Sequence, residues 1–206
     1  MTTVSDKSLF VVFEGIDGSG KTTLINNVIS LLSQERINSV SLREPTSGPH
    51  GKKIRSLLCM AEEPDANILL DLFMADRLED ASLNIIPALK SGNIVLLDRY
   101  YYSTAAYQSK NFSEAKDIIN RNRSLNLPEP DILFFLDIDP DIAYNRVASR
   151  EKNNNLECFE TPTRLRLIDS IYREIIPDNT VAIDAALSPD ETAKQVYMHI
   201  KDYIVP

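Results

Sequence analysis

The amino-acid sequence predicts an α/β fold in which a five-stranded parallel sheet carries helices on both faces. Short, uninterrupted apolar runs alternate with longer stretches whose apolar residues recur at helical spacing. Such runs are typical of parallel strands that are buried on both faces by helices. The 206 residues contain no internal repeat, low-complexity segment or boundary, so we expect a single domain over residues 1–206.

The first strand is predicted at residues 9–13, and the strongest motif of the chain follows it. Residues 15–22 read Gly-Ile-Asp-Gly-Ser-Gly-Lys-Thr and fit G-x-x-x-x-G-K-[ST], the pattern of a phosphate-binding loop that opens a helix. In this pattern the backbone amides cradle a polyphosphate, Lys21 reaches the β- and γ-phosphates, and the Thr22 hydroxyl binds Mg²⁺. A glycine turn that binds nothing is the alternative, which eight residues in register between a strand and a helix disfavour.

Charged residues follow two further predicted strands. A weaker strand at 39–42 runs into Arg43-Glu44-Pro45, and a strong strand at 93–98 ends in Asp98-Arg99-Tyr100. In open parallel sheets the carboxyl ends of the strands bind ligands, and an Asp there is typical of Mg²⁺-nucleotide sites. For Asp98 the alternative is a helix N-cap. For the Arg-Glu-Pro block an ordinary turn is equally compatible.

Helices are predicted at 52–60 and 65–90, the second ending near Gly92 and kinked or shortened by Pro87. Phe73 and Arg77 lie four residues apart on one face of the long helix. Core packing would explain Phe73 by itself. Arg77 follows an apolar run, and a cation at the edge of a buried face needs a partner.

The segment after Asp98 is rich in tyrosine, with three in succession at 100–102 and the pair Tyr107-Gln108. Tyrosines offer stacking faces and hydrogen-bonding tips, although a tyrosine-rich surface helix is the alternative. The remaining strands are predicted at 131–137 and 180–184. The remaining helices are predicted at 113–123, from 140 onward, at 163–176, and from 188 onward.

Arg146 and Arg150 are spaced four residues apart on a predicted helix, directly before the polar, turn-prone residues 151–155. Two arginines that face one way before a flexible loop fit a mobile lid that closes over phosphates. A solvated basic face is the alternative.

Composition excludes several classes of protein. The net charge is −8, the pI is about 4.8 and no dense basic run occurs, which disfavours a nucleic-acid partner. Two histidines and two cysteines without a C-x-x-C disfavour structural zinc, while a disulfide between Cys59 and Cys158 stays open. No signal-peptide region or membrane-spanning apolar run occurs, so we expect a cytoplasmic protein with no membrane partner.

The order and spacing of these motifs resemble the thymidylate kinases, nucleoside-monophosphate kinases of the P-loop class. The resemblance covers most of the chain. It depends on residues 13–23, the block 43–45, Phe73 with Arg77, the block 98–100, and Ser103-Thr104 through Tyr107-Gln108. It implies a P-loop NTPase fold and one kinase domain with a short lid at about 146–160. It also implies transfer of the γ-phosphoryl group of MgATP to dTMP in dTTP biosynthesis, by a homodimer.

The same resemblance implies roles for individual residues. Phe73 would stack on thymine, and Arg77 would bond its carbonyl edge. Asp17 would meet the sugar 3′-hydroxyl, Tyr107 would crowd the 2′ position, and Asp98 would serve the Mg²⁺ site with Thr22. The other substrate residues would be Arg43, Pro45, Arg99, Ser103, Thr104 and Gln108. The residues for ATP would be Gly15, Asp17, Gly18, Ser19, Gly20, Lys21, Thr22 and Thr23.

The chain departs from the family pattern in three places. Some members carry an arginine inside the phosphate loop, where this chain has Gly18 and Ser19. In addition to Lys21 and Arg99, a further catalytic cation would therefore come from the lid. The candidates are Arg150, Arg146 and Lys152. Cys158 takes the place of an arginine after the lid, and Thr-Ser-Gly replaces the commoner paired glycines after residue 45.

Two rival functions remain. One is a kinase for another acceptor, such as a deoxynucleoside or dUMP. The other is a nucleotide-dependent switch, but the chain lacks the Asn/Thr-Lys-x-Asp motif with which GTP switches usually bind guanine.

Overall fold

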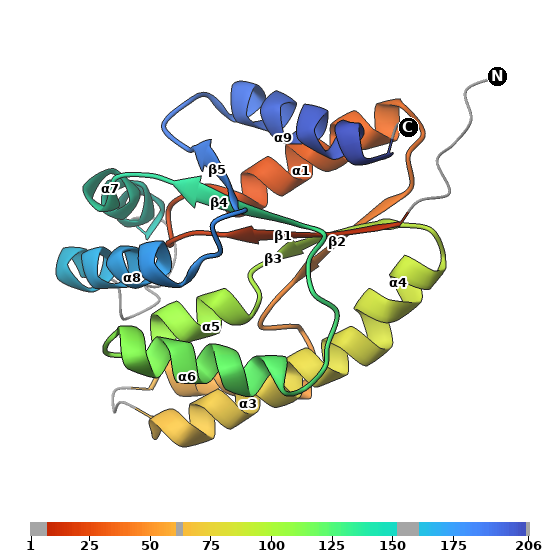
Figure 1. The fold of residues 1–206 in the computed structure, drawn as a ribbon. Helices are drawn as coiled ribbons and strands as arrows, with labels where there is room; N and C mark the ends of the chain where they lie inside the picture. Colours follow the sequence, from red (N-terminus) through yellow and green to blue (C-terminus); the bar gives the residue numbers. More distant parts are fainter. Residues whose placement is uncertain (1–7, 61–63, 152–160, 205–206) are drawn as a thin grey trace.

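The computed structural model describes residues 8–60, 64–151 and 161–204, with only the helical backbone given for residues 150 and 151. Within these residues one parallel sheet has the strand order β2-β3-β1-β4-β5 (Figure 1). Each predicted strand is confirmed to within one residue at either end. The strands are β1 (Leu9–Glu14), β2 (Ser39–Arg43), β3 (Ile94–Asp98), β4 (Ile132–Asp137) and β5 (Val181–Asp184).

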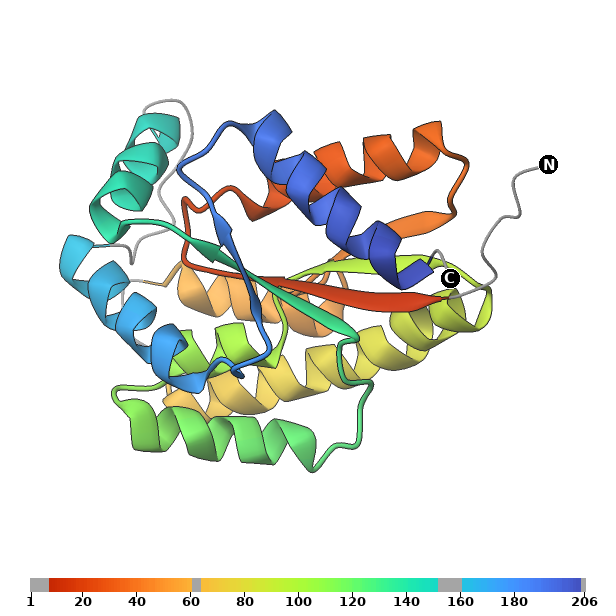
Figure 2. The ribbon, with the colours of Figure 1, turned by 45° about the horizontal axis from the view of Figure 1, so that its top comes forward.

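Helices cover both faces of this sheet, as predicted. In Figure 1, α1 and α9 lie side by side on one face, and α3, α4, α5 and α6 cover the other. Figure 2 shows α7 and α8 beyond the carboxyl ends of the strands. The helices are α1 (Lys21–Gln34), α2 (Pro49–Leu58), α3 (Ala66–Asp80), the π-helix η1 (Ala81–Ile85), α4 (Ile86–Lys90), α5 (Tyr101–Gln108), α6 (Phe112–Arg123), α7 (Pro140–Glu151), α8 (Pro162–Ile175) and α9 (Pro189–Ile204).

The core surrounds the central strand β1, whose residues are all buried. β1 pairs with β3 on one side and with β4 on the other, with Val12 opposite both Leu97 and Leu133. Phe13 and Phe134 stack across the β1–β4 pair with ring centroids 5.3 Å apart. The outer strands β2 and β5 are only partly buried, which explains why their apolar runs in the sequence are weaker.

The predicted long helix at 65–90 forms a continuous run of α3, η1 and α4. The interruption expected from Pro87 takes the form of a π-helical turn at 81–85, which places Pro87 in the first turn of α4, where its missing N–H is tolerated. Gly92, at φ 76°, ends the run in the left-handed region. Helix α2 begins at Pro49, earlier than predicted, because proline suits the first helical turn.

Helix α5 is buried, so its interpretation as a tyrosine-rich surface helix is wrong. Tyr100, Tyr101 and Tyr102 are each at most 3% exposed. Tyr100 packs edge-on against Phe10 of β1 at 5.5 Å between ring centroids. The three rings therefore belong to the core and offer no exposed stacking face.

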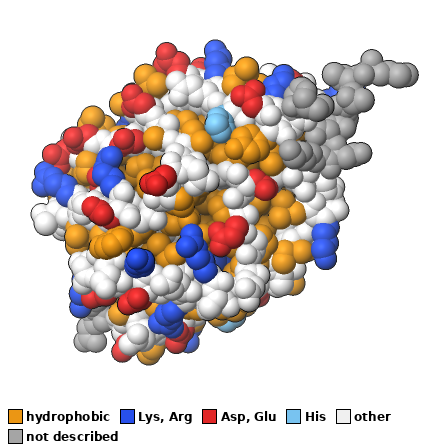
Figure 3. Space-filling view, in the orientation of Figure 1, with side chains coloured by type: hydrophobic (Ala, Val, Ile, Leu, Met, Phe, Trp, Pro, Cys, Tyr) orange, Lys and Arg blue, Asp and Glu red, His pale blue; other side chains and the backbone are white. Residues whose placement is uncertain are grey.

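Acidic and basic side chains are interspersed over the face shown in Figure 3, with hydrophobic side chains across its middle. Over the part of the chain that the structure describes, no helix combines the length and the apolar character needed to cross a membrane.

The carboxyl ends of β1, β2 and β3 meet at one edge of the sheet. The N–H of Arg99 donates to the Phe13 carbonyl at 3.0 Å, and the N–H of Glu44 donates to the Asp98 carbonyl at 3.1 Å. Strands β2 and β3 lie on one side of β1, and β4 and β5 lie on the other. The edge near β1 is therefore the point at which the strand order reverses. Ligands of open α/β sheets bind at such a point.

Candidate active site

The predicted phosphate-binding loop joins β1 to the N-terminus of α1. The Lys21 ammonium donates to the carbonyls of Gly15 at 2.8 Å and Ile16 at 3.0 Å, and to the Ser19 hydroxyl at 3.3 Å. Burial, reinforced by the charge of Arg99, lowers the pKa of Lys21 to about 8. The loop thus holds a desolvated cation beside a helix N-terminus, and both features favour a bound polyphosphate.

Gly18 explains why this loop carries no arginine at that position. Its φ is +83°, in the left-handed region, and a Cβ built on it would lie 2.2 Å from the carbonyl oxygen of Ala143 in α7. Any side chain there would collide with a helix backbone that cannot move independently. The loop therefore packs directly on α7, the helix from which the predicted lid begins.

A pair of oxygen ligands lies beside the loop. The Thr22 hydroxyl donates to Asp98 Oδ2 at 2.7 Å. Asp98 Oδ1 is buried and has no hydrogen-bond partner among the described residues. Mg²⁺ prefers carboxylate and hydroxyl oxygens, so the orphaned oxygen and its neighbour fit the predicted metal site. Thr23 follows as an exposed residue in the first turn of α1.

A second cluster joins the loop to the end of β3. Arg99 forms an ion pair with Asp17, and its guanidinium lies 4.8 Å from the centre of the Tyr107 ring. The Tyr107 hydroxyl donates to Asp17 Oδ2 at 2.8 Å and accepts from the Asp17 N–H at 2.9 Å. Arg99 also donates to the Ser103 hydroxyl at 3.2 Å. Three other predicted substrate residues, Asp17, Ser103 and Tyr107, therefore contact Arg99.

The backbone of Arg99 is strained. Its φ of 73° lies in the left-handed region, which residues other than glycine rarely adopt. Such strain persists only where the surrounding structure imposes it, and it is concentrated at functional sites. The strained conformation accompanies the placement of the guanidinium beside the phosphate-binding loop.

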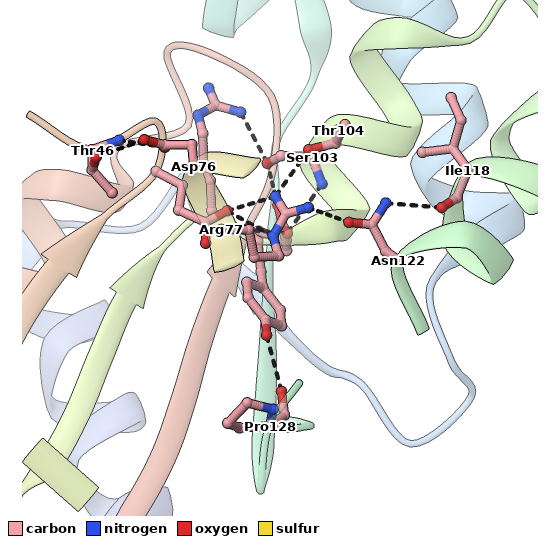
Figure 4. Close-up of polar contacts among 12 residues, drawn as sticks. Thr46, Asp76, Arg77, Ser103, Thr104, Ile118, Asn122 and Pro128 are labelled. Carbon is pink, nitrogen blue, oxygen red and sulfur yellow. Dashed lines mark hydrogen bonds and ion pairs between the residues drawn. The ribbon is translucent and has the colours of Figure 1, made fainter. Parts of the chain in front are cut away.

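Arg77 is the centre of a third cluster (Figure 4). It is 1% exposed, and its guanidinium lies 5.0 Å from the centre of the Tyr100 ring. Nε and Nη2 donate to Glu44 Oε2, Nη1 donates to the Asn122 side chain, and Nη2 also donates to the Thr104 hydroxyl at 3.0 Å. The expected partner of Arg77 is thus confirmed, and it is the glutamate of the Arg-Glu-Pro block.

Glu44 is a buried carboxylate with an unusual environment. Burial raises the pKa of Glu44 to about 8, although Arg77 acts in the opposite direction. The carboxylates of Asp76 and Asp80 add to the increase. Asp76 in turn accepts from the N–H and the hydroxyl of Thr46, at 2.7 Å and 2.6 Å, and so ties the loop after β2 to α3.

The other predicted substrate residues lie near this edge without forming a hydrogen bond that defines their role. Arg43 is exposed at the end of β2, in register with Asp98 of β3. Pro45 follows through a cis peptide bond. Phe73 is half-buried, one helical turn before Arg77, and Gln108 is the half-buried last residue of α5. Their contacts with substrate remain predictions.

The predicted lid arginines are described in part. Arg146 donates to the Ala185 carbonyl at 3.1 Å, just after β5. Arg150 is the penultimate residue of α7, and its side chain lies outside the described residues, as do residues 152–160 with Lys152 and Cys158. Arg164 in α8 donates to the carbonyl of Tyr107. Cys59 is exposed and forms no disulfide within the part of the chain that the structure describes.

Three residues of this region received no role from the sequence, namely Glu14, Asn122 and Tyr172. The sequence could have indicated Glu14, because it is an acidic residue at the end of an apolar strand. An acidic residue that is buried there must have hydrogen-bond partners. The sequence could not have indicated Asn122, because this residue belongs to a helix whose sequence is mostly polar. Tyr172 is buried in α8 and lies close to Glu14 and Tyr107.

The chain is similar to known proteins over most of its length. A family model described as thymidylate kinase matches residues 13–196. The thymidylate kinase of Leptospira borgpetersenii is 44% identical over 190 residues, which are 92% of each chain. That of Leptospira interrogans (serovar copenhageni) is 41% identical over 189 residues, again 92% of each chain. A probable thymidylate kinase of Archaeoglobus fulgidus is 37% identical over 196 residues, 95% of this chain and 96% of that protein. The chain therefore belongs to the thymidylate kinase family, the enzymes that phosphorylate dTMP.

Proposed function

We propose that this protein transfers the γ-phosphoryl group of MgATP to dTMP, giving dTDP and ADP, for dTTP biosynthesis. The observation that carries the proposal is the placement of two kinds of group at one edge of the sheet. Lys21, Thr22 and Asp98 form a donor side around the phosphate-binding loop, and Arg99 with Asp17 forms an acceptor side next to it. Phosphoryl transfer depends on such positioning and on charge neutralisation.

On the donor side, the amides of the loop and Lys21 would bind the β- and γ-phosphates. Thr22 and Asp98 would hold Mg²⁺, which neutralises charge on the phosphates. Lys21 now donates to acceptors of its own loop, so bound phosphate oxygens would take the place of these acceptors.

On the acceptor side, Arg99 and Arg43 would bind the phosphate of dTMP. Asp17 would accept from the sugar 3′-hydroxyl. The Tyr107 hydroxyl donates to Asp17, and its ring lies against Arg99. As the family resemblance implies, this ring would exclude a 2′-hydroxyl.

For the base, Arg77 is the central group. Guanidinium N–H groups only donate, so they suit a carbonyl edge such as that of thymine and disfavour the amino edge of cytosine. Glu44 and Asn122 hold this guanidinium from two sides. Phe73 would stack on the ring, and Ser103, Thr104 and Gln108 would complete the base site together with Pro45.

The catalytic arginine that the loop lacks would be supplied by a lid at about residues 146–160, with Arg150 the first candidate and Arg146 the second. The chain would act as one kinase domain over residues 1–206. ATP and dTMP are metabolites of the cytoplasm, which is the compartment we propose.

A coupled ADP-release assay with MgATP tests the proposal. The acceptors are dTMP, dUMP, dCMP, dGMP and thymidine, and Lys21→Met serves as the control for contaminating kinases. We expect dTMP to give the highest kcat/KM and thymidine to give none. Faster turnover of dCMP or thymidine than of dTMP would replace this function with that of another acceptor kinase.

We also propose a homodimer. Ile68 in α3 is 55% exposed and Leu83 in η1 is 64% exposed, and both lie on the continuous helical run of α3, η1 and α4. Exposed apolar side chains along one helix fit an interface with a second copy. Light scattering coupled to size exclusion should give twice the chain mass for the wild type and a lower mass for Ile68→Glu with Leu83→Glu.

A further inference from the structure

Glu14 is a fully buried carboxylate at the end of β1, directly before the phosphate-binding loop. One oxygen, Oε1, accepts from the N–H groups of Tyr100 at 2.8 Å and Ser103 at 3.1 Å. The other, Oε2, accepts from the Ser103 hydroxyl and from the Tyr172 hydroxyl at 2.9 Å. Four donors from α5, its N-cap and α8 thus converge on one side chain.

These donors include two backbone amides at a helix N-terminus, of which the Ser103 amide also donates to the Tyr100 carbonyl at 3.1 Å. Tyr100 is the N-cap of α5, and its own side chain makes no cap hydrogen bond. The first amides of a helix have no partner within the helix and favour negative charge. Glu14 supplies both the acceptor and the charge from a strand that is 86 residues earlier in the chain.

Glu14 and its neighbour also hold the backbone on both sides of the strained residue Arg99. The Phe13 carbonyl accepts from the Arg99 N–H at 3.0 Å, and Glu14 accepts from the next N–H, that of Tyr100. Phe13 and Glu14, consecutive residues of β1, therefore accept from the consecutive amides of Arg99 and Tyr100, where the φ of Arg99 is 73°. The guanidinium of Arg99 then extends to Asp17 of the loop.

We propose that Glu14 is a positioning residue for the acceptor side, which fixes the start of α5, and with it Arg99 and Ser103, relative to the phosphate-binding loop. The proposal rests on the acceptor role of Arg99 given above. A core role alone does not require a carboxylate, because a buried charge is expensive and an apolar side chain would fill the same volume. On balance burial raises the pKa of Glu14, and the hydrogen bonds from Ser103 and Tyr100 and the charge of Arg99 offset only part of this increase.

Glu14→Gln tests the proposal, because glutamine keeps the shape but loses the charge and turns one acceptor into a donor. We expect its Kd for dTMP to rise about 10- to 100-fold, the value of hydrogen bonds to a charged group. We expect its Kd for a non-hydrolysable ATP analogue to change less than about threefold, since the bonds of Glu14 are to the acceptor helix. Calorimetry gives both constants, and amide exchange of Tyr100 and Ser103 in the free protein should accelerate.

Two further variants separate positioning from loss of stability. Tyr172→Phe removes one of the four donors and leaves both amides bonded, so dTMP should bind about three- to tenfold more weakly, with ATP-analogue binding unchanged. Val196→Ala, in the buried face of α9, lowers stability away from this edge and should leave dTMP binding unchanged. If Glu14→Gln does not fold, Tyr172→Phe carries the test.

The proposal is overturned if folded Glu14→Gln binds dTMP like the wild type. It is also overturned if Glu14→Gln weakens the binding of dTMP and of the ATP analogue equally. The same holds if Val196→Ala, which lowers only stability, weakens dTMP binding as much as Glu14→Gln does. When Tyr172→Phe carries the test, wild-type dTMP affinity in that variant overturns it. Failure of the wild type itself to bind dTMP would refute the proposed function. Faster exchange of the Tyr100 and Ser103 amides in Glu14→Gln would still show that Glu14 fixes the start of α5.

Discussion

The hydroxyl of Thr22 donates a 2.7 Å hydrogen bond to the carboxylate of Asp98 and so joins the first turn of α1 to the end of β3. The second oxygen of Asp98 has no hydrogen-bond partner among the described residues. This pairing leaves one buried carboxylate oxygen beside the phosphate-binding loop, which fits the proposed Mg²⁺ site.

Asp98→Asn should raise the Mg²⁺ concentration needed for half-maximal rate by about 10- to 100-fold, because it removes the charge near the metal and keeps the volume. Initial rates over a Mg²⁺ titration at saturating ATP and dTMP provide the measurement. Asp137→Asn, at the end of β4 in a half-exposed pair with Arg173, is the matched control. An equal Mg²⁺ requirement in both variants would contradict a metal role for Asp98.

The affinity for ATP should fall at alkaline pH. Since burial lowers the pKa of Lys21 to about 8 in the free protein, the ammonium is progressively lost above that pH. Bound phosphates favour the charged form, so binding takes up a proton, and affinity should fall about tenfold per pH unit above 8. Calorimetry at pH 9 in buffers of different ionisation enthalpy should report uptake of about one proton. Lys21→Met should bind more weakly and show no such uptake.

Tyr107 combines a steric and a polar function that two substitutions separate. Tyr107→Ala removes the ring and should raise activity with ribothymidine monophosphate relative to dTMP. Tyr107→Phe keeps the ring and loses the hydrogen bonds of the hydroxyl, which include those to Asp17 and Arg99. Its selectivity should therefore stay near that of the wild type while KM for dTMP rises. The ratio of kcat/KM for the two acceptors is the measurement. A ribo-to-deoxy ratio that is the same in all three proteins would show that Tyr107 does not exclude ribonucleotides.

Phe73→Ala should weaken dTMP binding by about 1–3 kcal/mol, the scale of one base–aromatic stack. The residue is half-buried one turn from Arg77, so part of its ring is free of the core. Calorimetric titration with dTMP gives the value. Met74→Ala, the next residue and half-buried against the core, controls for lost packing. If Phe73→Ala is folded and binds dTMP as tightly as Met74→Ala does, Phe73 serves only in packing.

Arg150→Ala should lower kcat by about 10²-fold or more while leaving the Kd for dTMP nearly unchanged, by analogy with arginine groups that act in the transition state. Arg150→Lys should restore activity only in part, because it keeps the charge and loses the fork. Arg146→Ala should act mainly on ATP binding, because we expect the Arg146 guanidinium to stack on adenine. Turnover near that of the wild type in both alanine variants would shift the search to Lys152 or to Arg164 and Arg166.

The sequence by itself determined the strands, the phosphate-binding loop and the edge of the sheet that carries the site. These features are local. An apolar run of four to six residues identifies a strand buried on both faces, and the loop motif defines its own backbone. Strand ends then bring Gly15, Arg43 and Asp98 to one edge, because parallel strands share a direction.

Only the tertiary structure decided which side chains hold the site together. Arg77 finds Glu44 at a separation of 33 residues and Asn122 at 45, and Glu14 finds the amide of Tyr100 at 86. It also decided that Gly18 meets the backbone of α7. These contacts depend on how each helix is rotated and seated on the sheet, which the spacing of residues within one segment does not encode. Each such contact is needed for stability once it is buried, because a buried charge or amide without a hydrogen-bond partner is costly.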